Sequence, residues 1–267
     1  MSDSYNTPWR KTATAVYGPP KDGKIFGTVE LDVTDALKFI EQQRAAGIQL
    51  TITHLITSAL ARALAHDVPE INCYVRRGRI VSREHADVAV AVKLTSGTGV
   101  GVVCIRKAEQ KSLPELSEEI YRRADAHRAG DEESVSSSKM FFERIPWPFR
   151  RPLIRIITWL VYELGVTIGP FRAAHHPFGS IILTNVGSLG LSTAMVALFP
   201  PARLPAAVAI GRMEEKAVVR DGKIVIRTIL PVTGTFDHRI VDGEQAGKLV
   251  KAVTSYLENP ELIDAKA

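Results

Sequence analysis

The sequence predicts an α/β protein in which helices cover a mixed β-sheet. Three observations support this fold class: runs of β-branched residues with alternating polarity, longer segments with apolar residues at helical spacing, and an Asp-Gly hairpin turn at 221–222. Strands do not alternate strictly with helices, which separates the pattern from a nucleotide-binding βαβ fold. The length of 267 residues allows one large domain or two small ones.

The N-terminal half is predicted to begin with an irregular arm over residues 1–24, because several prolines interrupt it. The elements expected next are a strand (25–33), two helices (35–47 and 50–68), a hairpin or two short strands (73–76 and 79–82), two strands (87–94 and 100–105) and a helix (111–130). Asp32 or Thr34 is the candidate cap of the first helix. A threonine opens the second helix, and Ser112 is the candidate cap of the third.

The C-terminal half starts with a polar stretch, 129–140, followed by a hydrophobic and basic block, 141–171. The elements expected after it are strands at 180–187, 206–213 and 217–236 and a closing helix at 243–263. The last of these strand segments contains the Asp-Gly turn and is therefore predicted to form a hairpin.

The composition excludes several classes of protein. A hydrophobic fraction of 45% with 24% charged residues is typical of a soluble globular protein. The net charge of +5 is spread along the chain, which disfavours a nucleic-acid interface but suits a nucleotide-bearing cofactor or an acidic membrane. Two cysteines indicate neither a disulfide framework nor a metal site. With no apolar segment at the start of the chain, these features predict a cytoplasmic protein.

The segment TFDHRIVDG, 235–243, carries the main candidate site. His238 follows a predicted strand, and histidine is the side chain best suited to proton transfer near neutral pH. Asp242 lies four residues later, and Gly243 permits a backbone geometry or close approach that a side chain would block. From these residues alone, a structural His–Asp pair and a general base with its supports both remain open.

FDHRIVDG resembles the His-x-x-x-Asp-Gly motif of the catalytic domain of dihydrolipoamide acyltransferases, the core components of 2-oxo acid dehydrogenase complexes. The motif is shared with chloramphenicol acetyltransferase and peptide-synthetase condensation domains. Other blocks resemble the same family in order, including VELDVTDALKFI, ADVAVAVKL and SIILTNVGSLG. The resemblance covers most of residues 25–260 and implies a chloramphenicol acetyltransferase-like two-layer sandwich. It makes residues 25–267 the catalytic domain, with a family-atypical insertion at 141–172.

The resemblance also implies a mechanism. His238 is expected to be the general base that takes a proton from a thiol, and Thr184 the donor of a hydrogen bond to the oxyanion. Asp242 completes the site in a structural role, and Arg10 is the candidate partner of its carboxylate. Asn185, beside Thr184, is expected to shape its turn, as Gly243 does beside Asp242.

Coenzyme A is the substrate that the resemblance implies, and the implied assembly is a homotrimer or a multiple of trimers with the active site between subunits. No lipoyl-bearing segment is recognised, so a lipoyl group is expected only in trans, from another protein. SGTGVGVVCIRKA lacks the proline of the family's Gly-Leu-x-x-Pro-Val segment, which leaves the acyl group and acceptor open. The alternatives are a non-catalytic oligomeric core and a membrane-associated protein that handles acyl chains.

The block 141–171 has three possible roles. It is either a hydrophobic helix packed on the protein or at a subunit contact, an interfacial helix on anionic lipid, or a lid for an acyl chain. No metal site is predicted, since the pair His175 and His176 has no ligand-spaced neighbours. His54 and His66 lie on a predicted helix and are expected to be structural.

Overall fold

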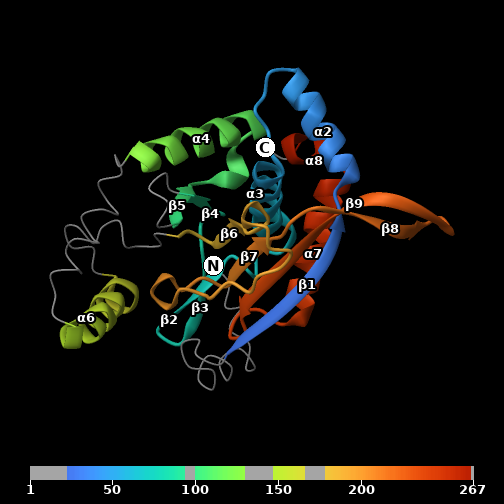
Figure 1. The fold of residues 1–267 in the computed structure, drawn as a ribbon. Helices are drawn as coiled ribbons and strands as arrows, with labels where there is room; N and C mark the ends of the chain where they lie inside the picture. Colours follow the sequence, from blue (N-terminus) through green and yellow to red (C-terminus); the bar gives the residue numbers. More distant parts are fainter. Residues whose placement is uncertain (1–22, 94–99, 130–146, 166–177, 266–267) are drawn as a thin grey trace.

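The predicted strands assemble into a seven-stranded sheet with the order β1-β9-β7-β6-β4-β5, in which β8 also pairs with β9 (Figure 1). The computed structural model describes residues 23–93, 100–129, 147–165 and 178–265. The strands of the sheet are β1 (Lys24–Asp32), β4 (Val88–Lys93), β5 (Val100–Ile105), β6 (Ile181–Asn185), β7 (Ala206–Ile210), β8 (Glu214–Arg220) and β9 (Lys223–Asp237). The β4–β6 and β6–β7 pairs are parallel and the others antiparallel, so the sheet is mixed, as predicted.

Strand β9 organises the sheet because it is long enough to pair with three other strands. Its second half pairs with β1 on one side and β7 on the other, and its first half pairs with β8. The β8–β9 hairpin turns at Asp221 and Gly222, whose φ angles of 50° and 74° are the positive values that a type I′ turn requires. The Asp-Gly hairpin prediction is therefore confirmed. A separate hairpin is formed by β2 (Cys73–Arg76) and β3 (Arg79–Ser82).

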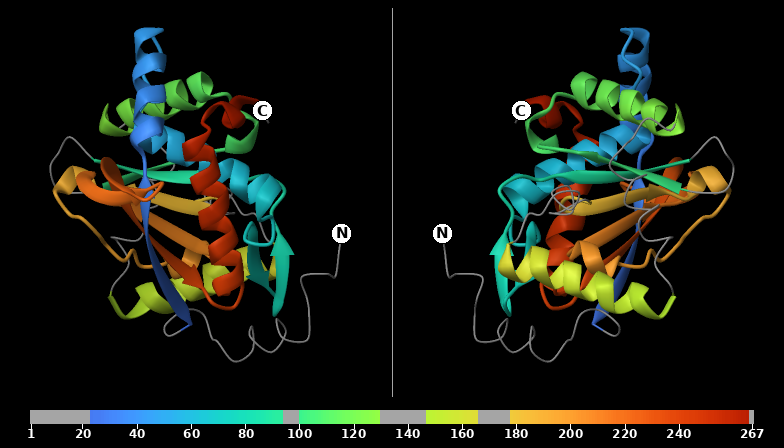
Figure 2. Two further views of the ribbon diagram at one scale, coloured as in Figure 1. Left: turned by 90° about the vertical axis from the view of Figure 1, so that its right-hand side faces the viewer. Right: turned by 90° about the vertical axis from the view of Figure 1, so that its left-hand side faces the viewer.

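Two helices, α3 and α7, pack against one face of the sheet and against each other (Figure 2). The helices are α2 (Thr34–Ala45), α3 (Ile52–Arg62), α4 (Leu113–Ala129), α6 (Trp147–Trp159), α7 (Gly243–Glu258) and α8 (Glu261–Ala265). Between this helix layer and the sheet lies the main hydrophobic core, which includes Leu55, Ile56 and Leu249 from the helices and Leu183 and Val208 from the strands. Burial of these side chains provides the main driving force for joining the two layers.

The helix starts agree only in part with the sequence. Thr51 caps α3, because its hydroxyl oxygen accepts a hydrogen bond from the backbone N–H of His54. Neither Asp32 nor Thr34 is the N-cap of α2, whose capping residue is Val33. The carboxylate of Asp32 instead accepts hydrogen bonds from Arg227 and Arg220 of the β8–β9 hairpin.

Helix α6 continues into a π-helical turn, Leu160–Leu164, and uses one side to pack on the β2–β3 hairpin. On that side Val161 and Tyr162 are buried against Tyr74. Across the described part of the chain, none of the helices combines the length and hydrophobicity needed to traverse a bilayer.

Candidate functional site

The turn between β9 and α7 holds His238 in a fixed place. Both Ile240 and Val241 donate their backbone N–H to the carbonyl oxygen of Asp237, at 2.9 and 3.0 Å. The backbone N–H of His238 donates to the carbonyl of Gly23, at 2.8 Å, so the turn is also tied to the residue that precedes β1. These bonds restrict the backbone on both sides of the imidazole.

A buried ion pair between Asp237 and Arg239 stabilises this turn. The guanidinium of Arg239 contacts both carboxylate oxygens of Asp237, with its Nε 2.9 Å from Oδ1 and an Nη nitrogen 2.6 Å from Oδ2. The backbone N–H of Arg239 also donates to the same carboxylate. Asp237 is 1% exposed and Arg239 is 8% exposed, so each charge depends on the other for its compensation. The pair therefore sets the shape of the segment that carries His238.

His238 has its Nδ1 atom beside two oxygen atoms. Its Nδ1 atom lies 3.1 Å from the carbonyl oxygen of Val241 and 3.1 Å from Oδ1 of Asp242. A carbonyl and an ionised carboxylate only accept hydrogen bonds, so Nδ1 carries the ring proton. The lone pair of the neutral ring is then on Nε2. With 29% of its side chain exposed, His238 combines this tautomer with access to solvent or substrate.

Asp242 has two structural connections. It is the N-cap residue of α7, and its backbone N–H donates to Oε1 of Gln245, as in a capping box. Its carboxylate also contacts His238, so it links the start of the helix to the imidazole. Gly243 differs from the prediction: its φ is not positive, and a Cβ placed there would meet no atom of the surrounding described chain within 4 Å. As the first residue of α7 it has ordinary helical backbone, so nothing among the described residues of one chain requires glycine there.

Thr184 and Asn185 end strand β6 at a second place on the sheet. Thr184 is half-buried, and Asn185 donates from Nδ2 to the hydroxyl of Thr53 at 3.1 Å, which joins the strand end to α3. The Oδ1 atom of Asn185 accepts from the backbone N–H of Ser188, and its carbonyl accepts from the Ser188 hydroxyl. Asn185 thus shapes the turn that follows Thr184.

The sheet register separates Thr184 from His238 within one chain. Thr184 pairs with Ala209, and Ala209 pairs with Thr233, which is five residues before His238 along the chain. Five residues of strand cover about 17 Å, and two strand spacings add about 10 Å in the perpendicular direction. The two residues are therefore roughly 20 Å apart. No direct contact between them is possible without a second copy of the chain.

Several predicted residues lie outside the described part of the chain. Arg10, the candidate partner of Asp242, is one of them, as are His175 and His176 and the ends of the block 141–171. Within the described ranges, no cluster of three potential metal-ligating side chains occurs.

Of the two histidines that were expected to be structural, His54 is buried and His66 is exposed. Burial lowers the pKa of His54 to about 4, and its Nδ1 lies 3.0 Å from the hydroxyl oxygen of Ser117. His66 is exposed on the π-helical turn that follows α3. Burial raises the pKa of both Cys73 and Cys104 to about 11, so neither thiol is an activated nucleophile.

Sequence reasoning assigned no role to two groups around His238. The opposite charges of Asp237 and Arg239 on either side of the histidine are visible in the sequence and could have suggested an ion pair. The sequence does not show that the two side chains are buried. The carbonyl of Val241 had no side-chain signal at all, because every residue carries a carbonyl.

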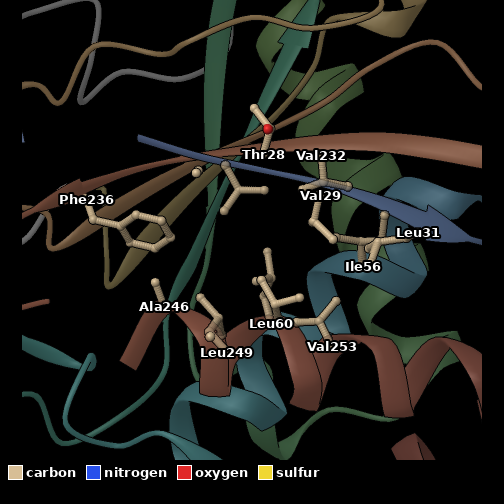
Figure 3. A pocket seen from close by; sticks show the side chains of 15 residues that line it. Thr28, Val29, Leu31, Ile56, Leu60, Val232, Phe236, Ala246, Leu249 and Val253 are labelled. Atoms are coloured by element: carbon tan, nitrogen blue, oxygen red, sulfur yellow. The ribbon is translucent and has the colours of Figure 1, made fainter. Parts of the chain in front are cut away.

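A cavity of about 240 Å³ lies between the sheet and helix α7 (Figure 3). Its walls come from five elements, β1, α3, β7, β9 and α7, and include Val29, Leu31, Ile56, Leu60, Leu249 and Val253. The ring of Phe236, two residues before His238, forms a further part of the wall.

Comparison with known sequences identifies relatives of this chain. The profile of the family described as 2-oxoacid dehydrogenases acyltransferase (catalytic domain) matches residues 24–139 and 172–264. A dihydrolipoyllysine-residue acetyltransferase component of the acetoin cleaving system of Bacillus subtilis (strain 168) is 30% identical over 242 residues, which are 87% of this chain and 49% of the relative. The chain spans about half the length of the curated relatives it matches.

Solved structures confirm the predicted fold class. The cubic core of a pyruvate dehydrogenase multienzyme complex superposes with a TM-score of 0.66 and 20% identity, covering 95% of this chain and 87% of that one. A chloramphenicol acetyltransferase superposes with a TM-score of 0.56 and 16% identity, covering 95% of this chain and 97% of that one. At these identities the likeness concerns the fold alone, and it is the predicted chloramphenicol acetyltransferase-like architecture.

Proposed function

Because this chain belongs to the family of 2-oxoacid dehydrogenase acyltransferase catalytic domains, we propose that it moves an acyl group between a coenzyme A thioester and a thiol or other small acceptor. The observation that carries the proposal is the hydrogen bonding of the His238 imidazole. Its Nδ1 proton is held by Val241 and Asp242, which leaves the Nε2 lone pair for proton transfer.

The reaction follows from this base. Nε2 of His238 takes the proton of the acceptor thiol, and the thiolate attacks the carbonyl carbon of the acyl-coenzyme A. The carbonyl oxygen becomes an oxyanion, which accepts a hydrogen bond from the hydroxyl of Thr184. When the carbon–sulfur bond to coenzyme A breaks, the imidazolium returns its proton to the departing thiolate. A new thioester and free coenzyme A result, and the histidine is again neutral.

The site is proposed to form between copies of the chain, since Thr184 and His238 are roughly 20 Å apart in one chain by strand register. In a homotrimer, each His238 faces the Thr184 of a neighbouring copy. Coenzyme A is a substrate, and a dihydrolipoyl group, where it is the acceptor, is supplied in trans by another protein. Arg10 is the proposed partner of the Asp242 carboxylate.

The activity is tested by the release of free thiol from a panel of acyl-coenzyme A thioesters, with and without dihydrolipoamide. Replacing His238 by alanine should reduce the rate by about 10²–10⁴-fold, which is the usual effect of removing a general base. A folded oligomer that turns over no thioester with any acceptor would instead support a non-catalytic oligomeric core.

Subunit mixing tests the shared site. His238→Ala and Thr184→Ala proteins are each expected to be nearly inactive, but co-refolded mixtures of the two should regain activity. With random mixing in a cyclic trimer, about one quarter of the interfaces combine an intact histidine with an intact threonine. Mixtures that stay as inactive as the separate variants would rule out a site between subunits.

We further propose that helix α6 contacts an anionic membrane surface. Phe149, Ile156 and Trp159 are more than half exposed on α6, and Arg155 is exposed beside them. The helix contains three arginines and no acidic residue, which suits an interfacial helix. The matched family profile leaves out residues 140–171, so the shared fold does not explain this face.

Vesicle flotation tests the membrane contact. Wild-type protein should float with vesicles that contain phosphatidylserine and remain unbound with pure phosphatidylcholine. The variant with Phe149, Ile156 and Trp159 all replaced by serine should lose flotation. A control with Val219, Ile224 and Ile226 replaced by serine removes the same number of exposed apolar residues from the β8–β9 hairpin. Equal flotation of the α6 variant and wild type would contradict the proposal.

A further inference from the structure

We propose that the cavity between the sheet and helix α7 binds the aliphatic chain of the acyl substrate, which makes thioesters of medium-chain acids the substrate class. The inference rests on the proposed acyltransferase function and specifies what that site accepts. Its support comes from the chemistry of the walls, from the glycines that leave the space open and from its position beside the turn that holds His238.

The walls suit a hydrocarbon. Thr28 is the one residue among those lining the cavity with a polar side-chain atom, and the rest are aliphatic residues, Phe236 and glycines (Figure 3). Water entering such a space would find few hydrogen-bonding partners, and apolar cavities of about 150 Å³ stay dry and bind benzene. Since about 150 Å³ holds the six carbons of benzene, a volume of about 240 Å³ has room by proportion for a chain of about eight to ten carbons.

One of the lining glycines, Gly234, is explained by packing. Gly27 and Gly234 are opposite each other on β1 and β9. A Cβ on Gly234 would lie 2.6 Å from the ring of Phe236, so that ring covers the strand where the side chain would be. This arrangement resembles the rescue of strand glycines by a neighbouring aromatic ring.

Gly247 has no such explanation. It lies inside α7, where glycine destabilises a helix relative to alanine, and a Cβ built there meets nothing within 4 Å. Gly247 also lines the cavity. Gly247 is exposed, so its missing side chain leaves one edge of the cavity open to solvent, where an apolar group that matches the walls can enter.

The cavity lies beside the catalytic turn. Phe236 is two residues before His238, at the end of β9, while Ala246 and Gly247 are in the first turns of α7, just after Asp242. The turn from 238 to 242 therefore connects two walls of the cavity. An acyl chain held there lies against both segments that position the imidazole.

The chain-length dependence of kcat/KM tests the inference. For acyl-coenzyme A thioesters from two to twelve carbons, kcat/KM should rise about fourfold per added methylene, to about eight carbons, and then level off. Gly247→Leu should lower the ratio of octanoyl- to acetyl-coenzyme A turnover by at least tenfold. Ser255→Leu, on the exposed side of α7 away from the cavity, adds the same side chain outside the cavity and should preserve the ratio.

Binding to inactive protein separates this inference from the proposed function. Calorimetry should detect octanoate binding to the His238→Ala protein and its loss when Gly247→Leu is added. Circular dichroism checks the fold, and Val250→Phe is a second cavity-filling variant. No octanoate binding and a flat chain-length profile, in an enzyme that turns over acetyl-coenzyme A, overturns the cavity assignment alone. Octanoate binding in a wild-type protein that turns over no thioester overturns the proposed function but supports the cavity.

Discussion

Lowering the pH from 7 to 5 should destabilise the protein through one buried imidazole, that of His54. His54 is 4% exposed, its Nδ1 lies 3.0 Å from the Ser117 hydroxyl oxygen, and its ring meets Tyr121 edge-on at 4.9 Å. Burial disfavours the charged ring and lowers the pKa of His54 from 6.5 to about 4, although a hydrogen bond to the backbone of Gln49 opposes the shift. The folded chain thus keeps this imidazole neutral where the unfolded chain protonates it.

The sign and size of the effect follow from linkage. Between pH 6.5 and about 4 the unfolded state binds more protons at this site, so the stability due to neutral His54 is complete above pH 6.5 and is lost as the pH falls toward 4. At about 1.4 kcal/mol per pH unit, the loss between pH 7 and pH 5 is about 2 kcal/mol.

Urea denaturation of wild type and His54→Leu at pH 7 and pH 5 measures this contribution. Leucine cannot titrate, so the variant should lose about 2 kcal/mol less of its free energy of unfolding than wild type over this interval. His66→Gln, on the exposed side of the following turn, is the control for losing one imidazole. Equal pH dependence in wild type and His54→Leu would refute the reasoning.

Three further predictions concern other residues. Arg239→Met should cost about 3–5 kcal/mol of stability by leaving the buried carboxylate of Asp237 without its partner, and a loss below 1 kcal/mol in urea denaturation would show that the pair is dispensable. Burial alone would raise the pKa of Asp32, but hydrogen bonds led by that from Arg227 lower it to about 2. Asp32→Asn should therefore remove about 2 kcal/mol of stability that wild type loses as the pH falls from about 4 to 2, and identical acid unfolding curves would contradict this. Thr51→Ala should destabilise the protein by about 1 kcal/mol through loss of the α3 cap, as thermal unfolding can check against Thr51→Ser, which keeps the hydroxyl.

The proposed membrane contact of α6 and the proposed acyl-chain site in the apolar cavity would serve the same kind of substrate. A chain that handles medium-length acyl groups would benefit from contact with a surface where such groups are concentrated. The two proposals rest on different residues and fail independently, since flotation probes Phe149, Ile156 and Trp159 while the chain-length profile probes Gly247.

Local sequence was sufficient for most elements and for the family. Alternating polarity predicted β1, the Asp-Gly pair predicted the turn between β8 and β9, and a threonine marked the start of α3. The four-residue spacing of His238 and Asp242 correctly suggested a close pair at a helix start. Each of these features depends on contacts within a few residues, which is why a single segment reveals them.

Contacts between distant segments were decided by the tertiary structure. The strand order places Thr184 and His238 at separate ends of the sheet, because β7 runs parallel to β6 and antiparallel to β9. The sequence does not encode that pairing in either strand alone. Likewise, the space beside Gly247 exists only when α7 packs over β1 and β9. The proton on Nδ1 of His238 is assigned from the carbonyl of Val241, and a backbone carbonyl is a group that every residue has. The sequence by itself determined which chemical groups are available, and the packing of the sheet against its helices determined which of them meet.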